Sequence, residues 1–452
     1  MRGYVESLLS KQASIGVWGI GYIGCSTMAY YAEAGIKCIG VDVDASRVDT
    51  LNRGEIPVPG LEAWFDFETE PLISKRLMRA TTDTAEVLNQ KVPVHFICVP
   101  TERDGRPELS ILETVIDQIA AAIKNDSTFS PLVVIESTMT PGTTDKLVIP
   151  LFQSHGLIVG QDLLLGVAPR RDWFVAKGQS LRNLDRICGG FDEESSEETL
   201  SVLGIVCQTL HQASSYKVSE IVKCVENAFR HMEITLANQL SLAYPDHDIR
   251  ELLRLVGTKW NVGTYHPSFG TGGYCIPLSS QYVLEGAQAP QELTLLAETL
   301  QTDTAIRERV AESVISRGCK RVGVLGLSYR GNLKVSILSP TIGIVKALLD
   351  RKIEVKVCDP YYGDEEIRHQ TGAFTFSFPS DIQEFDALLI TADHQEFASE
   401  ESREALLNLP IKPLILDNYG LWSDWKLREH GFEYYQAGEA NWLGNLKVPS
   451  VI

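Results

Sequence analysis

The sequence has no apolar run long enough to span a membrane, and Met1 to Gln12 lack the apolar core of a secretory signal. It is also short of positive charge, because 41 basic residues stand against 59 acidic ones, for a net charge of −18. An acidic surface repels nucleic acids and anionic lipid surfaces. We therefore expect a cytoplasmic protein whose partners include neither nucleic acid nor membrane.

Paired cysteine spacings are absent as well. The nine cysteines are dispersed, with no Cys-x-x-Cys motif and no cluster of histidine and cysteine. An odd, dispersed set of cysteines is typical of reduced thiols in a cytoplasmic protein. We therefore expect no disulfide framework and no metal site.

No short-period repeat and no low-complexity linker divides the chain, yet its 452 residues exceed what one hydrophobic core holds. Residues 14–42 predict a strand, a glycine turn, a helix and a strand, the unit that opens a doubly wound sheet. Residues 320–358 repeat this order, and residues 215–243 predict one long helix. The fold class we expect is α/β, with two Rossmann-like doubly wound domains joined by a long central helix. Further elements are predicted as buried strands at 94–99, 132–136, 387–390 and 414–416, and as a helix at 291–317.

The first glycine turn has the spacing of a dinucleotide-binding motif. Gly19 permits the tight turn, Gly21 lets the backbone approach a pyrophosphate, and Gly24 lets helix and strand pack closely. Asp42 ends the next strand, where a carboxylate accepts hydrogen bonds from ribose hydroxyls and repels a 2′-phosphate. We predict NAD rather than NADP as cofactor, with Arg47 complicating that preference. A glycine turn without a ligand is the alternative.

Polar residues also follow two predicted strands. Thr101 comes after one strand, and Ser137 and Thr138 come after the next. Ligands of open α/β sheets bind beyond the carboxyl ends of the strands, so these side chains are expected at the cofactor, the alternative being simple strand caps. The predicted cofactor-binding set is Gly19, Ile20, Gly21, Tyr22, Ile23, Gly24, Asp42, Arg47, Thr101, Ser137 and Thr138.

Two residues four apart on the long helix share one face. Lys223, if shielded from water, would act as a base or stabilise an alkoxide, and Asn227 would hold a water or an oxyanion. The alternative is a solvated polar stripe.

Cys275 follows a glycine-rich loop that contains Gly270, Gly272 and Gly273. Backbone N–H groups of such a loop would activate the thiol and bind phosphate. A small buried hydrophobic residue is the alternative. Together with a nicotinamide site, a thiolate that traps an aldehyde predicts oxidation of an alcohol to a carboxylate on one protein.

Taken together, these motifs resemble those of the UDP-glucose/GDP-mannose dehydrogenase family of NAD-dependent nucleotide-sugar 6-dehydrogenases. The resemblance runs from Gly19 to about Trp422 and is closest to the branch that acts on UDP-N-acetylhexosamines. The blocks that carry it include Gly19-Ile-Gly-Tyr-Ile-Gly24, Phe96-Ile-Cys-Val-Pro-Thr101, Ser219-Glu-Ile-Val-Lys-Cys-Val-Glu-Asn-Ala-Phe-Arg230, Gly270-Thr-Gly-Gly-Tyr-Cys275-Ile-Pro and Val324-Leu-Gly-Leu-Ser-Tyr-Arg330.

The resemblance implies an N-terminal NAD-binding domain over 1–200 and a central helical dimerisation region with the cysteine loop over 201–315. A C-terminal nucleotide-sugar-binding domain follows over 316–452. It further implies a homodimer that oxidises the C6 alcohol of a nucleotide sugar through a thiohemiacetal and a thioester on Cys275, with Lys223 and Asn227 handling the oxyanion and the water. The implied substrate-binding residues are Arg170, Arg171, Arg230, Phe269, Gly270, Gly272, Gly273 and Arg330.

The chain also departs from the family pattern. Arg170 stands where the family has the glutamate linked to thioester hydrolysis, with Asp172 two residues later. The other departures are Ser279 for an aspartate, Ile337 and Tyr419 for arginines, and Tyr274 for a histidine. They leave two alternatives open: an oxidoreductase that stops after one oxidation or diverts the intermediate, and a non-catalytic ligand-binding homologue.

Overall fold

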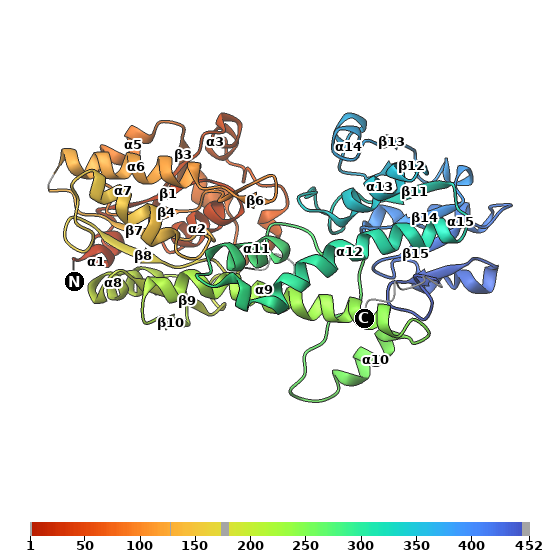
Figure 1. Ribbon diagram of the computed structural model, residues 1–452. Helices are drawn as coiled ribbons and strands as arrows, with labels where there is room; N and C mark the ends of the chain where they lie inside the picture. The colour runs from red at the N-terminus through yellow and green to blue at the C-terminus, as the bar shows by residue number, and fades with distance from the viewer. Residues whose placement is uncertain (1, 127, 173–179, 445–452) are drawn as a thin grey trace. The chain divides into compact units, whose positions relative to one another are not determined.

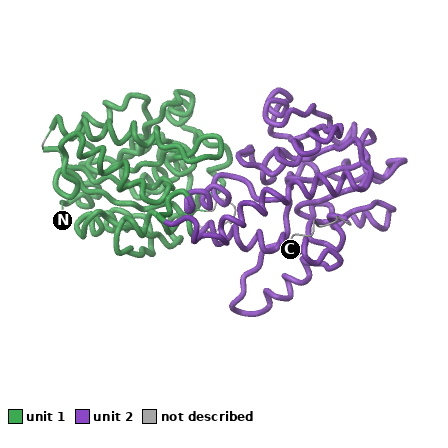
Figure 2. Tube along the Cα trace, viewed as in Figure 1, with its two compact units in different colours: residues 1–225, 285–288 green, residues 226–284, 289–452 purple. Residues whose placement is uncertain are grey.

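The computed structural model describes residues 2–126, 128–172 and 180–444. The chain forms two compact units, coloured separately in Figure 2. The first unit comprises Met1–Val225 and Glu285–Gln288, and the second comprises Glu226–Leu284 and Ala289–Ile452. The boundary falls inside the long helix α9 (Tyr216–Ala243).

The first unit is built on an eight-stranded sheet in the order β10-β9-β8-β7-β4-β1-β2-β3 (Figure 1). All neighbouring strands run parallel except β8 and β9, which pair antiparallel. The strands are β1 (Ser14–Trp18), β2 (Lys37–Val41), β3 (Met78–Thr81), β4 (Val94–Ile97), β7 (Leu132–Ile135), β8 (Leu164–Val167), β9 (Arg186–Gly190) and β10 (Leu210–Gln212), with a separate hairpin of β5 (Glu102–Arg103) and β6 (Arg106–Pro107).

Helices cover both faces of this sheet because successive residues of each strand point to opposite sides. Ile15 and Val17 of β1 pack in one core cluster with residues of α2, whereas Trp18 packs in a second cluster with residues of α6. The helices of the first unit are α1 (Tyr4–Leu9), α2 (Tyr22–Glu33), α3 (Ala45–Asn52), α4 (Glu70–Ser74), α5 (Thr84–Leu88), α6 (Ser110–Asn125), α7 (Ile149–Ser154), α8 (Glu193–Leu203) and the first part of α9.

The second unit contains a six-stranded parallel sheet in the order β13-β12-β11-β14-β15-β16. Val322 and Val324 of its central strand pack under α12 and α13, and Leu325 packs with residues of α15 on the other side. The strands are β11 (Arg321–Leu325), β12 (Glu354–Cys358), β13 (Phe374–Thr375), β14 (Ala387–Ile390), β15 (Leu414–Asp417) and β16 (Tyr434–Gln436). The helices are α10 (Ile249–Val256), α11 (Ile276–Gly286), α12 (Thr294–Ser316), α13 (Pro340–Asp350), α14 (Asp364–Thr371) and α15 (Glu400–Leu407).

The predicted fold class is confirmed, as are both glycine-turn units and the long helix at residues 215–243. The two compact units do not follow the three expected segments one for one. The sheet of the first unit continues past residue 200 to β10, and helix α12 shares a core cluster with β11 and α13 of the second unit. The three expected domains stay a prediction, and helix α12 packs on the core of the second unit.

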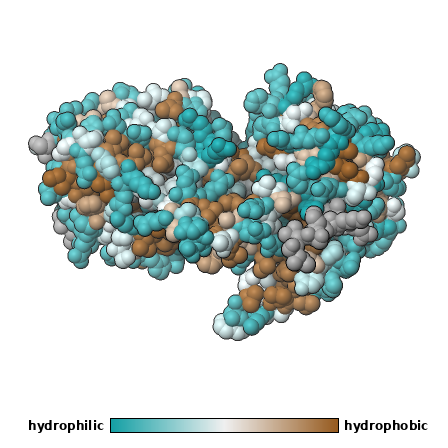
Figure 3. All heavy atoms as spheres, viewed as in Figure 1, coloured by the Kyte–Doolittle hydropathy of each residue, from teal (hydrophilic) through white to brown (hydrophobic). Residues whose placement is uncertain are grey.

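Several large apolar side chains of the second unit face solvent. Phe229 and Leu236 on α9 are more than half exposed, and so are Leu255 on α10 and Trp260 just after it. Hydrophobic atoms gather on and around α10 in the space-filling view (Figure 3). Among the described residues, no helix is long and apolar enough to cross a membrane.

Candidate functional site

The glycine turn of the first unit has the three properties that a dinucleotide requires. Gly19 has a φ of +87°, and a Cβ there would lie 2.7 Å from the Cys98 carbonyl oxygen. A Cβ on Gly24 would lie 1.8 Å from the Gly19 carbonyl oxygen, so only glycine lets α2 pack this closely on β1. A Cβ on Gly21 would meet nothing within 4 Å, which leaves open space over the turn.

The start of α2 offers donors to that open space. Gly21 is the N-cap residue, and no side chain caps the helix. The first N–H groups of a helix lack intrahelical acceptors and favour an anion. The turn therefore fits the pyrophosphate of NAD, with the peptides of Ile20, Tyr22 and Ile23 around it.

Asp42 is tied to the turn through backbone hydrogen bonds. Its carboxylate accepts the N–H of Ile20 at 2.8 Å and that of Asp44 at 2.9 Å. The Arg47 guanidinium lies 3.7 Å from Asp42 and 3.6 Å from Asp44. Each carboxylate oxygen has a second lone pair, so Asp42 keeps acceptor capacity for a ribose hydroxyl while it holds the glycine turn.

The polar residues after β4 and β7 bond to each other's segments. Thr101 donates its hydroxyl to the Thr138 carbonyl, and Ser137 donates its hydroxyl to the Val99 carbonyl at 2.7 Å. Both hydroxyls thus fasten two neighbouring strand ends together. Their expected contacts with the cofactor stay predictions.

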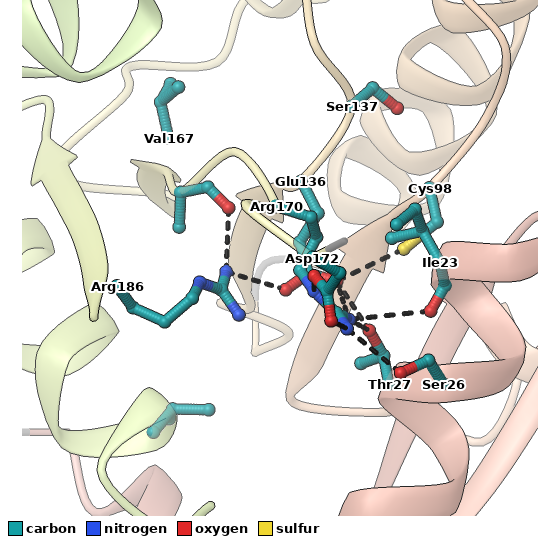
Figure 4. Close-up of polar contacts among 12 residues, drawn as sticks. Ile23, Ser26, Thr27, Cys98, Glu136, Ser137, Val167, Arg170, Asp172 and Arg186 are labelled. Carbon is teal, nitrogen blue, oxygen red and sulfur yellow. Dashed lines mark hydrogen bonds and ion pairs between the residues drawn. The ribbon is translucent and has the colours of Figure 1, made fainter. Parts of the chain in front are cut away.

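The structure gives Arg170 a set of protein partners in a buried network (Figure 4). Its Nε and Nη2 donate to both oxygens of Asp172 at 2.6 Å, and Nη2 also donates to Ser26 at 3.0 Å. Nη1 donates to the Thr27 hydroxyl and to the Ile23 carbonyl. All five N–H groups of the guanidinium therefore have acceptors, and the residue is 3% exposed. The expected contact of Arg170 with a substrate stays a prediction, while the structure gives its guanidinium protein acceptors throughout.

The network extends to a second arginine. Glu136 lies 3.5 Å from Arg170, accepts the Thr27 hydroxyl at 2.6 Å and accepts Arg186 at 2.9 Å. Two arginines thus face two carboxylates, Glu136 and Asp172, at the carboxyl ends of β7 and β8. Burial opposes the charge of Arg170, but Asp172 and Glu136 outweigh burial and raise the pKa of the guanidinium.

Asp172 is the carboxylate that, by its position in the sequence, could replace the glutamate missing at residue 170. Burial alone would raise its pKa, but the Arg170 charge and hydrogen bonds lower it. Both oxygens are held by Arg170, so Asp172 is not placed as a free general base in this conformation. Its neighbour Arg171 donates to the Asp185 carbonyl at 2.8 Å.

In the second unit, Cys275 immediately precedes α11. The N–H of Ser279 donates to the Cys275 carbonyl at 3.1 Å, the first bond of the helix. All nine cysteines lie among the described residues, and Cys275 alone falls in the exposed class. Cys275 is therefore accessible at the start of a helix.

Other parts of the second unit accept several N–H groups in and next to the glycine loop, and the expected role of the loop as a set of phosphate donors stays a prediction. Phe269 donates to the Asn418 side chain at 2.8 Å, Thr271 to the Asp303 carboxylate at 2.7 Å, and Gly273 to the Ile337 carbonyl at 2.9 Å. The loop is thus anchored by distant elements that the sequence does not place beside it.

The α9 face that carries Asn227 contacts the helix after the cysteine. Asn227 is buried and donates to the Ser279 hydroxyl at 3.0 Å. Four residues later, His231 lies 2.9 Å from the Ser280 hydroxyl through Nδ1. Sequence reasoning missed His231, although its spacing of four from Asn227 was a usable signal. Lys223 is half-buried one turn before Asn227 on the same helix.

The remaining predicted substrate residues fall in different settings. The Phe269 ring is fully buried and stacks on Trp442 at 5.7 Å, so its side chain belongs to the core rather than to a ligand. Arg230 donates to the Tyr265 hydroxyl at 3.3 Å. Arg330 is half-buried on the loop after β11, where the neighbouring Tyr329 carbonyl accepts the Tyr419 hydroxyl at 2.7 Å.

Metal-binding groups of three or more His, Cys, Asp or Glu side chains are not found in the described part of the chain. The donors and space of the first unit thus suit a dinucleotide, and the second unit presents an accessible thiol at a helix start.

Comparisons with known proteins agree with this arrangement. Models of the UDP-glucose/GDP-mannose dehydrogenase family match residues 13–204 with the NAD binding domain, 217–305 with the central domain and 323–424 with the UDP binding domain.

Among curated relatives, the UDP-N-acetyl-D-mannosamine dehydrogenase of Methanococcus aeolicus is 27% identical over 461 residues, which covers 96% of this chain and 98% of that protein. The UDP-N-acetyl-D-glucosamine 6-dehydrogenase of Pseudomonas aeruginosa is 26% identical, covering 86% and 92%. The solved structure of UDP-D-ManNAc dehydrogenase from Pyrococcus horikoshii shares the fold with a TM-score of 0.77 at 24% identity, covering 94% of this chain and 99% of that one.

Proposed function

The chain belongs to the UDP-glucose/GDP-mannose dehydrogenase family and is an NAD-dependent oxidoreductase acting on CH–OH groups, and from this premise we propose that it oxidises the C6 alcohol of a UDP-N-acetylhexosamine to a carboxylate. The relatives are named as dehydrogenases, so the non-catalytic alternative is not retained. The observation that carries the proposal is the exposed Cys275 at the start of α11.

The proposed chemistry uses a thiol to join two oxidations. NAD, when bound, accepts the hydride in each oxidation. Lys223 takes the alcohol proton or stabilises the alkoxide, and Asn227 donates to an oxyanion or a water. The Cys275 sulfur adds to the C6 aldehyde, and loss of a second hydride converts the thiohemiacetal into a thioester. Attack by water on the thioester carbonyl returns the thiol and releases the acid, so two NAD and one water are consumed per sugar.

A second candidate function is supported by the Arg170 network. Arg170 and Asp172 satisfy each other, and Ser279 bonds to Asn227, so these positions hold no free carboxylate that would activate water. Loss of a general base lowers a rate about 100- to 10,000-fold. The enzyme would then release an aldehyde after one oxidation or pass the thioester to another acceptor.

The test is the number of NADH formed per sugar consumed, measured with UDP-N-acetylmannosamine, UDP-N-acetylglucosamine and UDP-N-acetylgalactosamine. Two NADH with a free acid support the proposed reaction, and one NADH with an aldehyde supports the second candidate. Cys275→Ala should abolish acid formation, whereas the matched control Cys358→Ala at the end of β12 should retain it. Full acid formation by Cys275→Ala would exclude the covalent route.

We also propose that the protein is a homodimer. Large apolar side chains are exposed on α9, at Phe229 and Leu236, and just after α10, at Trp260, and their burial against a second copy removes apolar area from water. Sedimentation at micromolar concentration should give the mass of two chains.

A further inference from the structure

Thr271, four residues before Cys275, is held through each of its polar groups. Its N–H donates to Asp303 at 2.7 Å, its carbonyl accepts Arg307 at 3.1 Å, and its hydroxyl lies 3.3 Å from His231 Nε2. Thr271 is 6% exposed. Three side chains from α9 and α12 therefore fix a single residue of the glycine loop through its two flanking peptides and its hydroxyl.

Asp303 is the centre of these contacts. One carboxylate oxygen accepts the Thr271 N–H and lies 3.7 Å from His231, and the other accepts Arg307 at 2.8 Å. His231 also contacts Ser280, one turn into the helix that Cys275 begins. The carboxylate thus links the loop before the cysteine to the helix after it.

The glycines of the loop are fixed from the other side by the segment after β11. A Cβ on Gly272 would lie 2.6 Å from Tyr329 Cβ, and a Cβ on Gly273 would lie 2.9 Å from the Tyr329 ring. Gly273 has a φ of +85° and donates to the Ile337 carbonyl. Gly272 and Gly273 of the loop therefore pack against Tyr329, and Thr271 bonds the loop to α12.

Such anchoring has a physical purpose, because a glycine-rich segment loses more conformational entropy on ordering than other sequences. Without anchors, the three glycines would let the thiol sample many positions. We propose that Asp303 is a positioning residue for Cys275: by holding the Thr271 peptide together with Arg307 and His231, it sets the sulfur at the start of α11. This inference rests on the proposed role of Cys275 as the nucleophile.

The test compares Asp303→Asn with Asp386→Asn. Asp386, like Asp303, pairs with an arginine and accepts backbone N–H groups, two in its case and one in that of Asp303, but it lies at the amino ends of β11 and β14. Hydrogen exchange of the peptide covering residues 268–275 should accelerate on the order of tenfold in Asp303→Asn only. The kcat should fall about 10- to 100-fold, because misplacement of a reacting group by about 1 Å costs up to about 100-fold. The KM for NAD should stay within about twofold of wild type.

A second pair of variants covers the possibility that Asp303→Asn does not fold. Thr271→Val keeps the N–H bond to Asp303 and removes the hydroxyl contact with His231, whereas Thr271→Ser keeps both. The expected order of kcat is wild type and Thr271→Ser together, then Thr271→Val, then Asp303→Asn. A folded Asp303→Asn with unchanged loop exchange, with unchanged kcat, or with a loss equal to that of Asp386→Asn would overturn the proposal. If only the threonine variants fold, wild-type kcat in Thr271→Val would overturn it.

Failure of the proposed function is distinguished by a readout that needs no substrate. Should wild type form no NADH with the three sugars, alkylation of Cys275 by iodoacetamide at pH 7 replaces kcat. The alkylation rate of Asp303→Asn should then differ from that of wild type by at least about threefold, because the freed loop no longer holds the sulfur at one position. An unchanged alkylation rate would overturn the proposal.

Discussion

Replacing Arg170 by methionine removes a charge from the buried network of the first unit while retaining much of the side-chain volume. Asp172 and Glu136 then stay buried with only Arg186 to balance them. Removing one partner of a buried ion pair costs about 3–5 kcal/mol, because the remaining charge is left without compensation. For a domain of this size, each kcal/mol lowers Tm by about 2–4 °C, which gives a decrease of about 6–20 °C.

Scanning calorimetry at pH 7 measures the effect, and the Tm of the transition of the first unit is compared between variants. Arg170→Lys keeps the charge but lacks the planar guanidinium that bonds to both oxygens of Asp172, so its Tm should lie between those of wild type and Arg170→Met. The surface control is Arg403→Met, whose exposed partner Glu400 lies on the same turn of α15. That change should cost less than about 1 kcal/mol.

The pH dependence gives an independent check. Arg170 holds the pKa of Asp172 below its ordinary value of about 3.9, so the pair stabilises the fold fully above that pH. The contribution is lost as the pH falls through the folded-state pKa. The difference in Tm between wild type and Arg170→Met should therefore shrink below about pH 4. If Arg170→Met lowers Tm at pH 7 by no more than Arg403→Met does, the account of a balanced buried network is refuted.

The other predictions concern the glycine turn and the apolar surface. Gly21→Val should weaken NAD binding at least about tenfold while changing stability by less than about 1 kcal/mol, because the new side chain enters open space over the turn. Titration calorimetry measures the affinity, and thermal unfolding measures the stability. An unchanged affinity would contradict the assigned cofactor site. Gly24→Ala should instead lower stability, by about 3 kcal/mol, because its Cβ meets the Gly19 carbonyl oxygen. A variant as stable as wild type would show that the turn tolerates a side chain. Trp260→Glu should shift the protein from dimer to monomer in sedimentation, and Ile411→Glu, exposed in the loop between α15 and β15, is the matched control. A dimer of unchanged stability in Trp260→Glu would exclude the segment after α10 from the interface.

Local patterns in the sequence were sufficient to predict the two glycine-turn units and the long helix. The strand, turn and helix at residues 14–42 depend on neighbours in the chain, because apolar β-branched runs and glycine spacing act over a few residues. The glycine-rich loop before Cys275 was equally visible in the sequence, whereas the helix α11 that follows it came from the structure. The long helix at residues 215–243 followed equally from its uninterrupted apolar pattern.

Tertiary structure alone decided what the polar side chains do. Arg170 contacts Thr27, 143 residues earlier, and Thr271 in the glycine loop contacts Asp303 on α12, so neither partner is visible in a local pattern. A sequence shows that an arginine or a loop N–H needs an acceptor, but only the fold decides whether that acceptor is a ligand or another residue. For this reason the sequence placed a charge and a set of donors at a predicted site, and the structure assigned Arg170 to a buried ion network and the loop N–H groups to Asn418, Asp303 and Ile337.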